Sequence, residues 1–433
     1  MTQGLNARRA AITALGFTLK SRTALDTALA QTPDFEKMEA RDRAFARLIS
    51  ATTLRRRGQI RGVLRKFMQR ALPDPDGEAQ LILETAVAQI LFLDTKPHAA
   101  VSAAVTLARG NRANERYAGM INAVLRKVST QGQAVAETIP VSQNLPRWLR
   151  ESWTAAYGEE RVEAIARAFD AAPPLDLTFK TAAQAEAFAK DTDSALLPTG
   201  TVRRMTIGDI TKLPGFDTGD WWAQDAGAAI PAMLLDAKPG EAVLDLCAAP
   251  GGKTMQLAAT GARVTALEAS PKRMKRLEDN LARVGLTAEM VTADGQDWGE
   301  AASFDAILLD APCSATGTLR RRPDAAWMKS REDVVSLAPI QDRLLVNAAR
   351  LLKPGGRMLI CTCSLQPEEG ELWLKRNLSR MAVGIDPVRA DEMPELEAAI
   401  LEDGTVRLTP DMWSDKGGID GFFIARLRKP ASA

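Results

Sequence analysis

Residues 246 to 254 read Leu-Cys-Ala-Ala-Pro-Gly-Gly-Lys-Thr and follow the apolar run Ala-Val-Leu-Asp at 242 to 245. A strand that leads through a glycine-rich turn into a helix is the ligand-binding unit of open α/β sheets. The Gly-Lys-Thr ending suggests a phosphate-binding loop, but that loop needs a glycine five residues before Gly252. Cys247 stands there, and we expect a cysteine to lack the required backbone freedom. The spacing disfavours a nucleoside triphosphate, and the missing Gly-x-Gly-x-x-Gly disfavours a nicotinamide cofactor.

Strand-like and helix-like segments alternate from residue 241 onward. The strands read AVLDLC, RVTALE, AEMVTA, FDAILLDA and RMLICTC, with helices between them that include 271 to 285 and 339 to 352, and DGFFIARL closes the series. Strands separated by helical crossovers indicate a doubly wound, mostly parallel sheet, for which we expect seven strands. Such a sheet binds its ligand at the carboxyl ends of its strands.

The N-terminal part of the chain reads as a series of short amphipathic helices, interrupted at 71 to 77 and before His98. Residues 1 to 130 carry 21 Lys and Arg against 11 Asp and Glu, although the whole chain has a formal net charge of only +2. This excess favours a polyanionic partner. Arg57, Arg61 and Arg65 lie on a helix between buried positions, where they form either a solvated face or a ridge that contacts RNA phosphates.

The segment between the helical and alternating parts mixes several patterns. Residues 131 to 146 are polar and without period, which predicts a linker, and residues 146 to 240 combine helices with strand-like pieces such as LDLTFK. We therefore expect three domains: a helical one at 1–135, a linker with a small α+β connecting subdomain at 136–225, and the α/β domain at 226–433.

Acidic residues close three of the predicted strands. Asp245 ends the first, Glu268 ends the second about twenty residues later, and Asp294 follows the third. Free backbone N–H groups at the helix start suit a carboxylate, and an acid at the second strand end suits a ribose diol. The set favours an adenosyl group joined to an amino acid, as in S-adenosylmethionine. Each acid alone would also suit a helix cap.

All four cysteines follow strands that would be neighbours in a sheet ordered 3-2-1-4-5: Cys247, Cys313, Cys361 and Cys363. They are too few for a secreted disulfide framework, which favours a cytoplasmic protein, and no apolar run reaches membrane-spanning length. A Cys-x-Cys pair on a strand fits a zinc site poorly, so we expect no metal. Buried inert thiols are the other reading. The single histidine, His98, excludes a Ser-His-Asp triad, and we expect it to have a structural or surface role.

Two thiols beside a methyl donor suggest a specific chemistry. Carbon 5 of a pyrimidine is a poor nucleophile until a thiolate adds to carbon 6 and makes an enamine that can accept a methyl group. The C5 proton must then leave and the thiolate must be expelled. In this reading one cysteine attacks and the second assists release.

Long motifs in the α/β half resemble the Rsm/Nop/Sun family of RNA cytosine-C5 methyltransferases, in particular its RsmB (Fmu/Sun) branch. They are DLCAAPGGKT (245–254), LLDAPCSATGTLRRRPD (308–324), CTCSLQPEEGE (361–371) and DGFFIA (420–425). WWAQDAGA (221–228) is similar to the family's lead-in segment, and residues 117–128 resemble part of a NusB-like RNA-binding domain. The resemblance implies a Rossmann-like methyltransferase core preceded by an all-α NusB-like domain, and 16S ribosomal RNA as substrate.

The resemblance also implies roles for individual residues. Cys363 would attack C6, Cys313 would promote release, and Asp310 with Lys253 would contact or protonate the N3 side of the cytosine. Apart from the resemblance, we expect Arg320, Arg321 and Arg322 to contact RNA phosphates, or else these arginines or Lys253 to provide a positive field for the nucleophile. The residues expected around S-adenosylmethionine are Cys247, Ala248, Ala249, Pro250, Gly251, Gly252, Lys253, Glu268, Asp294 and Asp310.

The same features leave rival functions open. The chemistry would serve another RNA such as tRNA, and a non-catalytic RNA-binding assembly factor would share the fold. A DNA cytosine methyltransferase would attack with the Pro-Cys cysteine, Cys313, and would lack a Thr-Cys-Ser partner. We expect a monomer without an obligate protein partner.

Overall fold

The structure, a computed structural model, describes residues 4–205 and 208–431. The described chain divides into two compact units. The first contains the chain as far as Asp170 and also Arg321–Ser330, and the second contains Ala171–Arg320 and the chain from Arg331 onward. The chain therefore leaves the second unit after Arg320 and rejoins it at Arg331.

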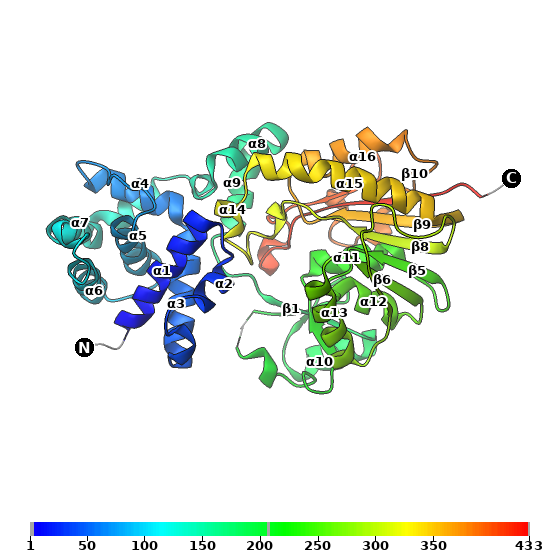
Figure 1. The fold of residues 1–433 in the computed structure, drawn as a ribbon, viewed down its shortest axis with the longest axis horizontal. Helices are drawn as coiled ribbons and strands as arrows, with labels where there is room; N and C mark the ends of the chain where they lie inside the picture. The colour runs from blue at the N-terminus through cyan, green and yellow to red at the C-terminus, as the bar shows by residue number, and fades with distance from the viewer. Residues whose placement is uncertain (1–3, 206–207, 432–433) are drawn as a thin grey trace. The chain divides into compact units, whose positions relative to one another are not determined.

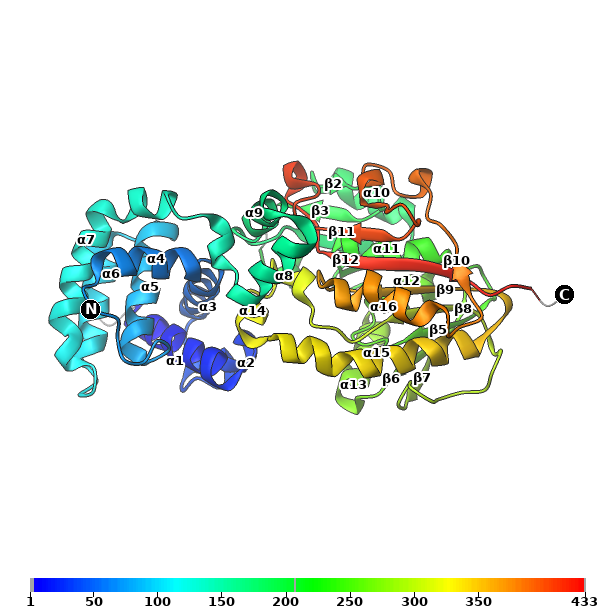
Figure 2. The same ribbon diagram turned by 90° about the horizontal axis from the view of Figure 1, so that it is seen from above.

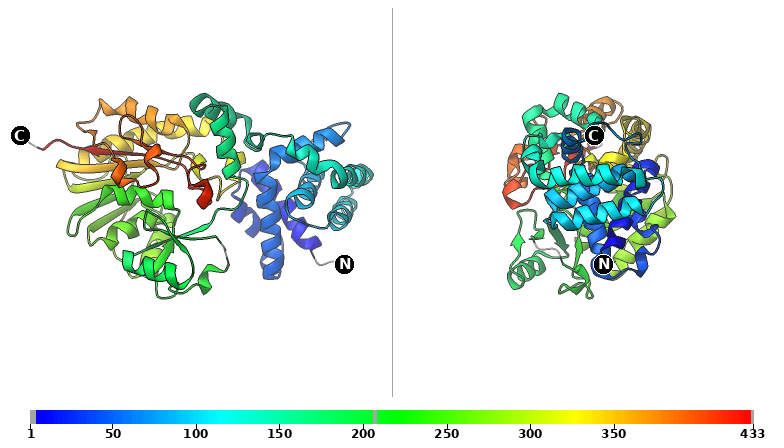
Figure 3. Two further views of the ribbon diagram at one scale, coloured as in Figure 1. Left: turned by 180° about the vertical axis from the view of Figure 1, so that it is seen from behind. Right: turned by 90° about the vertical axis from the view of Figure 1, so that its left-hand side faces the viewer.

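The first unit is helical, as predicted, and Figure 3 shows it from two sides. The helix α5 is buried around most of its circumference, which is the mark of a central core helix. Helices α1 to α4, α6, α7 and α14 contribute side chains to the same core. The helices of this unit are α1 (Leu5–Ser21), α2 (Leu25–Ala30), α3 (Ala40–Arg55), α4 (Arg57–Phe67), α5 (Glu78–Phe92), α6 (Pro97–Arg109), α7 (Ala118–Glu137), α8 (Arg147–Tyr157), α9 (Glu159–Ala168) and α14 (Ala325–Met328).

The predicted linker at 131 to 146 is wrong over its first half, because α7 continues to Glu137. Its buried positions there are Gly132 and Ala136, which are four residues apart and face the core as a helix requires. Gly132 lies close to Leu91 of α5, where a methyl group would come within 3.2 Å of the leucine. Because glycine and alanine are small, they do not form a recognisable apolar face in the sequence, and the helical periodicity of this segment could not be recognised. His98 lies exposed on α6, as expected.

The second unit begins with a small antiparallel sheet of strand order β2-β3-β1-β4. Its strands are β1 (Leu175–Phe179), β2 (Ala195–Leu196), β3 (Val202–Arg204) and β4 (Trp221–Ala223), and α10 (Ala182–Asp191) lies between β1 and β2 in sequence. A buried pair joins two of the strands, because Arg203 donates to both carboxylate oxygens of Asp176 at 2.7 Å. This sheet contains the LDLTFK stretch as β1.

The larger sheet has the strand order β10-β12-β9-β8-β5-β6-β7, and β11 pairs with β12 as an eighth strand among the described residues. The strands from β5 to β9 pair in parallel, whereas β12 is antiparallel to β9. The parallel strands follow the predicted order 3-2-1-4-5, so the carboxyl ends of β5, β8 and β9 meet at one edge. Their bounds are β5 (Ala242–Leu246), β6 (Arg263–Glu268), β7 (Glu289–Thr292), β8 (Phe304–Asp310), β9 (Leu352–Thr362), β10 (Gly384–Ile385), β11 (Val406–Leu408) and β12 (Phe422–Arg428).

Helices cover both faces of the larger sheet (Figure 1). On one face, α11 (Ala226–Leu235), α12 (Gly252–Ala259) and α13 (Pro271–Val284) pack on the strands. The other face is covered by α15 (Arg331–Leu351) and α16 (Glu371–Leu378), which are both labelled in Figure 2. Because both faces are buried, the central strands read as nearly continuous apolar runs.

Among the described residues, no helix combines the length and the apolar character needed to cross a membrane.

Candidate active site

The loop after β5 is a tight turn held against the neighbouring strand. The backbone N–H groups of Cys247 and Ala248 both donate to the carbonyl of Leu267 in β6, at 2.9 and 3.0 Å. Cys247 adopts a left-handed conformation with φ of 69°, and Gly251 caps α12 with φ of 107°. The Ala249–Pro250 peptide is cis. Our expectation that a cysteine lacks this backbone freedom is wrong, because the two hydrogen bonds to Leu267 hold Cys247 in the left-handed region.

The three predicted acids lie at the carboxyl edge formed by β5, β6 and β7. Glu268 is buried; its Oε1 accepts from Ser270 N at 2.9 Å, and its Oε2 lies 3.0 Å from Arg273 Nη1. Asp294 is exposed and binds the backbone N–H of Gln296, which lowers the pKa of its carboxyl group. Glu268 and Asp294 therefore also accept local backbone N–H groups, as the capping alternative from the sequence requires, whereas Asp245 accepts from the side chain of Thr254 instead.

Asp245 is the most buried of these acids. Its Oδ2 accepts from Thr254 Oγ1 at 2.5 Å, while its Oδ1 has no hydrogen-bond partner within residues 4–205 and 208–431. Burial raises the pKa of this carboxyl group to about 7. A buried acid with an unsatisfied oxygen beneath a glycine turn suits a ligand with positive charge. The residues of this edge thus fit an adenosyl group linked to a cationic amino-acid moiety.

Lys253 reaches from the first turn of α12 to the end of β8. Its Nζ donates to Asp310 Oδ2 at 2.7 Å and lies 5.3 Å above the ring centre of Phe422. Burial alone would lower the pKa of this lysine, but the Asp310 carboxylate outweighs it and the pKa is raised. Lys253 therefore stays protonated and holds a positive charge at the strand edge. The Sγ of Cys361 is 3.5 Å from Asp310 Oδ1, and this cysteine is fully buried.

The two cysteines that the sequence singles out lie side by side. The Sγ atoms of Cys313 and Cys363 are 3.5 Å apart, and both residues are partly exposed. The hydrogen bond with Cys363, burial, and the charges of Glu369 and Asp310 raise the pKa of the Cys313 thiol well above its usual value. Cys313 is therefore held as a protonated thiol. Burial likewise raises the pKa of Cys361 and of Cys247, so neither competes as a thiolate.

A hydroxyl and carboxylate network that the sequence did not reveal lies beneath these thiols. Glu369 is buried and accepts hydrogen bonds from Ser314 and Ser364, the residues that follow the two cysteines. Gln341 of α15 also donates to this carboxylate, at 3.2 Å. Glu369 falls within the quoted motif CTCSLQPEEGE, but a glutamate followed by a glycine and another glutamate reads as a solvated helix start. Nothing local in the sequence distinguishes it from its neighbour Glu368.

The predicted arginine ridge on α4 is wrong for its first member. Arg57 is 3% exposed and its Nε lies 3.0 Å from Glu84 Oε2, so it neutralises a buried glutamate instead of facing solvent. Arg61 shares the same partner at 2.7 Å and remains 29% exposed. Arg65 is exposed, as is Lys66 beside it. Only the last turn of the helix keeps the predicted surface charge.

The arginine run after Cys313 is divided in the same way. Arg320 is 1% exposed and lies 3.8 Å from Asp225 and 3.6 Å from Asp420, so the prediction that it contacts RNA phosphates is wrong. Those two carboxylates also offset its charge. Arg321 and Arg322 are exposed, and their contact with RNA stays a prediction.

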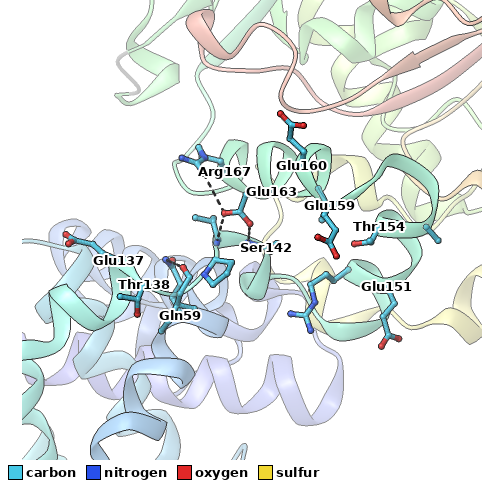
Figure 4. Close-up of a pocket in the computed structure, with 16 residues that line it drawn as sticks. Gln59, Glu137, Thr138, Ser142, Glu151, Thr154, Glu159, Glu160, Glu163 and Arg167 are labelled. Atoms are coloured by element: carbon cyan, nitrogen blue, oxygen red, sulfur yellow. Dashed lines mark hydrogen bonds and ion pairs between the residues drawn. The ribbon is translucent and has the colours of Figure 1, made fainter.

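A cavity of about 1190 Å³ lies in the first unit (Figure 4). Five glutamates and two arginines contribute to its lining. Glu163 accepts from the backbone N–H groups of Val141 and Ser142 at 2.8 and 2.9 Å, which fixes one wall. An acidic lining of this kind repels phosphates and does not extend the candidate active site.

Comparison with known proteins supports the reading of both halves. The 16S rRNA methyltransferase RsmB/F family matches residues 232–428, and the NusB family matches residues 5–130. The chain is 32% identical over 451 residues to ribosomal RNA small subunit methyltransferase B of Pseudomonas syringae pv. tomato, covering 99% of this chain and 98% of that protein. It is 35% identical to the protein of the same name from Xylella fastidiosa, covering 100% of both chains.

The fold agrees with a solved structure along nearly its whole length. The crystal structure of PH0851 is 25% identical and superposes with a TM-score of 0.75, covering 98% of this chain and 99% of that chain. The sequence similarity, the fold and the residues at the strand edge agree with one another. The chain therefore belongs to the RsmB/F family of 16S rRNA methyltransferases, which take their methyl group from S-adenosylmethionine.

Proposed function

We propose that this protein methylates carbon 5 of a cytosine in 16S ribosomal RNA through a transient bond between Cys363 and carbon 6. The observation that carries the proposal is the pair of thiols 3.5 Å apart at the carboxyl edge of the sheet, beside the Lys253–Asp310 pair. A pair of adjacent thiols matches a reaction in which one sulfur forms a bond that must later be broken.

Cys363 is the nucleophile in this mechanism. Its thiolate adds to C6 of the ring, which makes C5 electron-rich, and S-adenosylmethionine supplies the methyl group that C5 accepts. The proton on C5 is then lost to water, its electron pair re-forms the C5–C6 double bond, and the sulfur of Cys363 leaves.

Asp310 and Lys253 act on the pyrimidine in this proposal. Addition of sulfur to C6 pushes electron density toward N3 and the neighbouring oxygen, so a hydrogen-bond donor there stabilises the intermediate. The Asp310 side chain is 31% exposed, whereas that of Lys253 is 10% exposed, so Asp310 is the more accessible of the two. Lys253 orients Asp310 through the hydrogen bond that its Nζ donates to Asp310 Oδ2 at 2.7 Å.

Cys313 assists release. Held as a thiol, it can donate a hydrogen bond to the sulfur of Cys363 as the S–C6 bond breaks. A donor at this point stabilises negative charge on the departing sulfur. The two cysteines thus have different roles in this proposal, Cys363 as the nucleophile and Cys313 as the donor that assists release.

The first unit supplies the RNA contacts in this proposal. Its basic excess attracts phosphates, while one cytosine is unstacked so that C5 and C6 can be reached. Of the predicted residues in α4, Arg65 is the one exposed to solvent, and Lys66 adjoins it.

Changing Arg65 and Lys66 to glutamate is expected to weaken RNA binding and to reduce the slope of log K against log salt by about 1.5, because two phosphate contacts are lost. Fluorescence anisotropy over a salt series measures both quantities. The matched control changes Lys212 and Lys275, which are 82% and 66% exposed, and carries the same change of net charge. If both double variants lost the same RNA affinity and the same salt dependence, the effect would come from net charge alone and not from contacts at Arg65 and Lys66.

Bisulfite sequencing of 16S ribosomal RNA tests the proposed function. We expect one cytosine to resist deamination in cells that contain the protein, to become reactive when the gene is deleted, and to be protected again by the wild-type gene but not by Cys363→Ala. A protected cytosine in tRNA instead would support the same methylation chemistry but would make tRNA the substrate. Restoration by Cys363→Ala would favour a non-catalytic assembly factor.

A further inference from the structure

Glu369 is the residue on which the two cysteine loops converge. It ends a short 3-10 turn (Pro367–Glu369) after β9 and is 1% exposed. The proposed reaction gives it no role, and its carboxylate nevertheless accepts hydrogen bonds from four donor groups. A buried carboxylate is stable only when its oxygens are satisfied in this way.

One side of the carboxylate holds the Cys313 loop. Oε1 accepts from the backbone N–H of Ser314 at 2.9 Å, and Oε2 accepts from the hydroxyl of the same serine. Gln341 donates to Oε1 at 3.2 Å and to the carbonyl of Pro312 at 2.8 Å. The residues immediately before and after Cys313 are therefore both tied to this network.

The other side holds the Cys363 loop in the same manner. Ser364 Oγ donates to Oε2 at 2.6 Å, and Thr362 Oγ1 donates to the backbone carbonyl of Glu369 at 2.8 Å. The hydroxyls of Ser314 and Ser364 also lie 3.1 Å apart and join the two loops directly. Both neighbours of Cys363 are thus bound to Glu369, which also binds Ser314 directly and is linked to Pro312 through Gln341.

We propose that Glu369 is a positioning residue that sets the separation of the Cys313 and Cys363 sulfur atoms. It acts through the residues that flank each cysteine and not on the RNA. The consequence for catalysis rests on the proposed two-cysteine mechanism, whereas the consequence for the thiol geometry does not. Since a displacement of about 1 Å at reacting groups can cost about 100-fold in rate, a shared anchor for both loops matters to turnover.

Two substitutions separate positioning from gross loss of structure. Glu369→Ala leaves four buried donors without their acceptor, so both loops are free to shift. Glu369→Gln keeps the size of the side chain and one acceptor oxygen. Its amide nitrogen can face the two serine hydroxyls, which rotate to accept, while its oxygen faces Ser314 N–H and Gln341. We therefore expect a graded series in which Gln is the milder change.

The first test measures thiol geometry without RNA or S-adenosylmethionine. The full-length reduced protein is treated with dibromobimane, which becomes fluorescent once it has alkylated two thiols, and peptide mapping identifies the bridged pair. We expect rapid bridging of Cys313 to Cys363 in the wild type, about tenfold slower bridging in Glu369→Ala and an intermediate rate in Glu369→Gln. The control is Glu368→Gln, because this neighbouring side chain is 41% exposed and pairs only distantly with Arg331, at 4.0 Å.

The second test divides the kinetic effect. A positioning role predicts that kcat for methyl transfer falls about 100-fold in Glu369→Ala and about tenfold in Glu369→Gln, while KM for RNA and for S-adenosylmethionine stays within about threefold. If Glu369 only stabilised the fold, its substitution would lower the melting temperature, and the fraction of active protein would fall by as much as the rate. Active-site titration and thermal unfolding distinguish these cases.

Wild-type bridging rates in Glu369→Gln overturn the proposal whether or not Glu369→Ala folds. A drop in bridging confined to the Glu369 variants supports it. If the wild type bridges its thiols in a Glu369-dependent way but transfers no methyl group to RNA, the positioning role stands and the proposed function fails.

Discussion

Replacing Cys363 with alanine is expected to reduce methyl transfer to 16S ribosomal RNA at least about 1,000-fold while leaving S-adenosylmethionine binding intact. The reason is that C5 of a cytosine becomes nucleophilic only after sulfur has added to C6. The remaining thiols are poor substitutes: the hydrogen bond to Cys363 is lost in this variant, but burial and the charges of Glu369 and Asp310 still raise the pKa of Cys313, and burial raises that of Cys361. Tritiated methyl transfer under single-turnover conditions and calorimetric titration with the cofactor measure the two quantities.

The control for this substitution is Cys361→Ser. Cys361 is two residues away, is fully buried and donates to Asp310 Oδ1 at 3.5 Å, a bond that a serine hydroxyl can also make. We expect this variant to retain most of its activity. Turnover by Cys363→Ala within tenfold of the wild type would remove Cys363 as the nucleophile.

Replacing Cys313 with alanine is expected to produce a covalent protein–RNA complex that survives denaturing electrophoresis. The first half of the reaction needs only Cys363, so the S–C6 bond still forms. Its breakage loses the donor that lies 3.5 Å from the departing sulfur. Turnover should stop after about one methyl group per protein molecule, which a burst assay with labelled cofactor would show.

Two controls define this second result. The double variant Cys313→Ala, Cys363→Ala should form no complex, because the bond itself is missing. Normal multiple turnover by Cys313→Ala without any complex would show that release does not depend on this thiol.

The arrangement of the α/β half follows from local sequence patterns. Apolar runs that end in Asp245, Glu268 and Asp310 are separated by helical segments, and parallel strands with helical crossovers have few possible arrangements. Once the strand order is known, the cysteines that follow β5, β8 and β9 must lie at one edge. The helix predicted near 339 to 352 in fact begins eight residues earlier, at Arg331. Pro339 lies inside α15 and does not mark its start.

The features that the sequence did not reveal depend on contacts between distant segments. Arg57 and Arg320 look like surface cations by type, but buried acids far along the chain engage them: Glu84 in one case, Asp225 and Asp420 in the other. The left-handed Cys247 is held by Leu267 of a different strand. Local periodicity contains no information about such partners.

Glu369 shows the same limit most clearly. Its neighbour Glu368 is 41% exposed while Glu369 is 1% exposed, and the difference arises from the loops around Ser314 and Ser364 that close over it. The residue types of the site were readable from sequence, whereas the anchor that holds them together was not.

Mapping the covalent bond between protein and RNA shows which cysteine is the nucleophile. The unaltered protein is incubated with S-adenosylmethionine and a 16S ribosomal RNA fragment that contains 5-fluorocytidine, whose fluorine cannot leave C5 as a proton does, so the complex is trapped. Proteolysis and mass spectrometry then identify the modified peptide. We predict that the nucleotide is attached to Cys363. Attachment to Cys313, the cysteine that a DNA cytosine methyltransferase would use, would show that Cys363 is not the nucleophile.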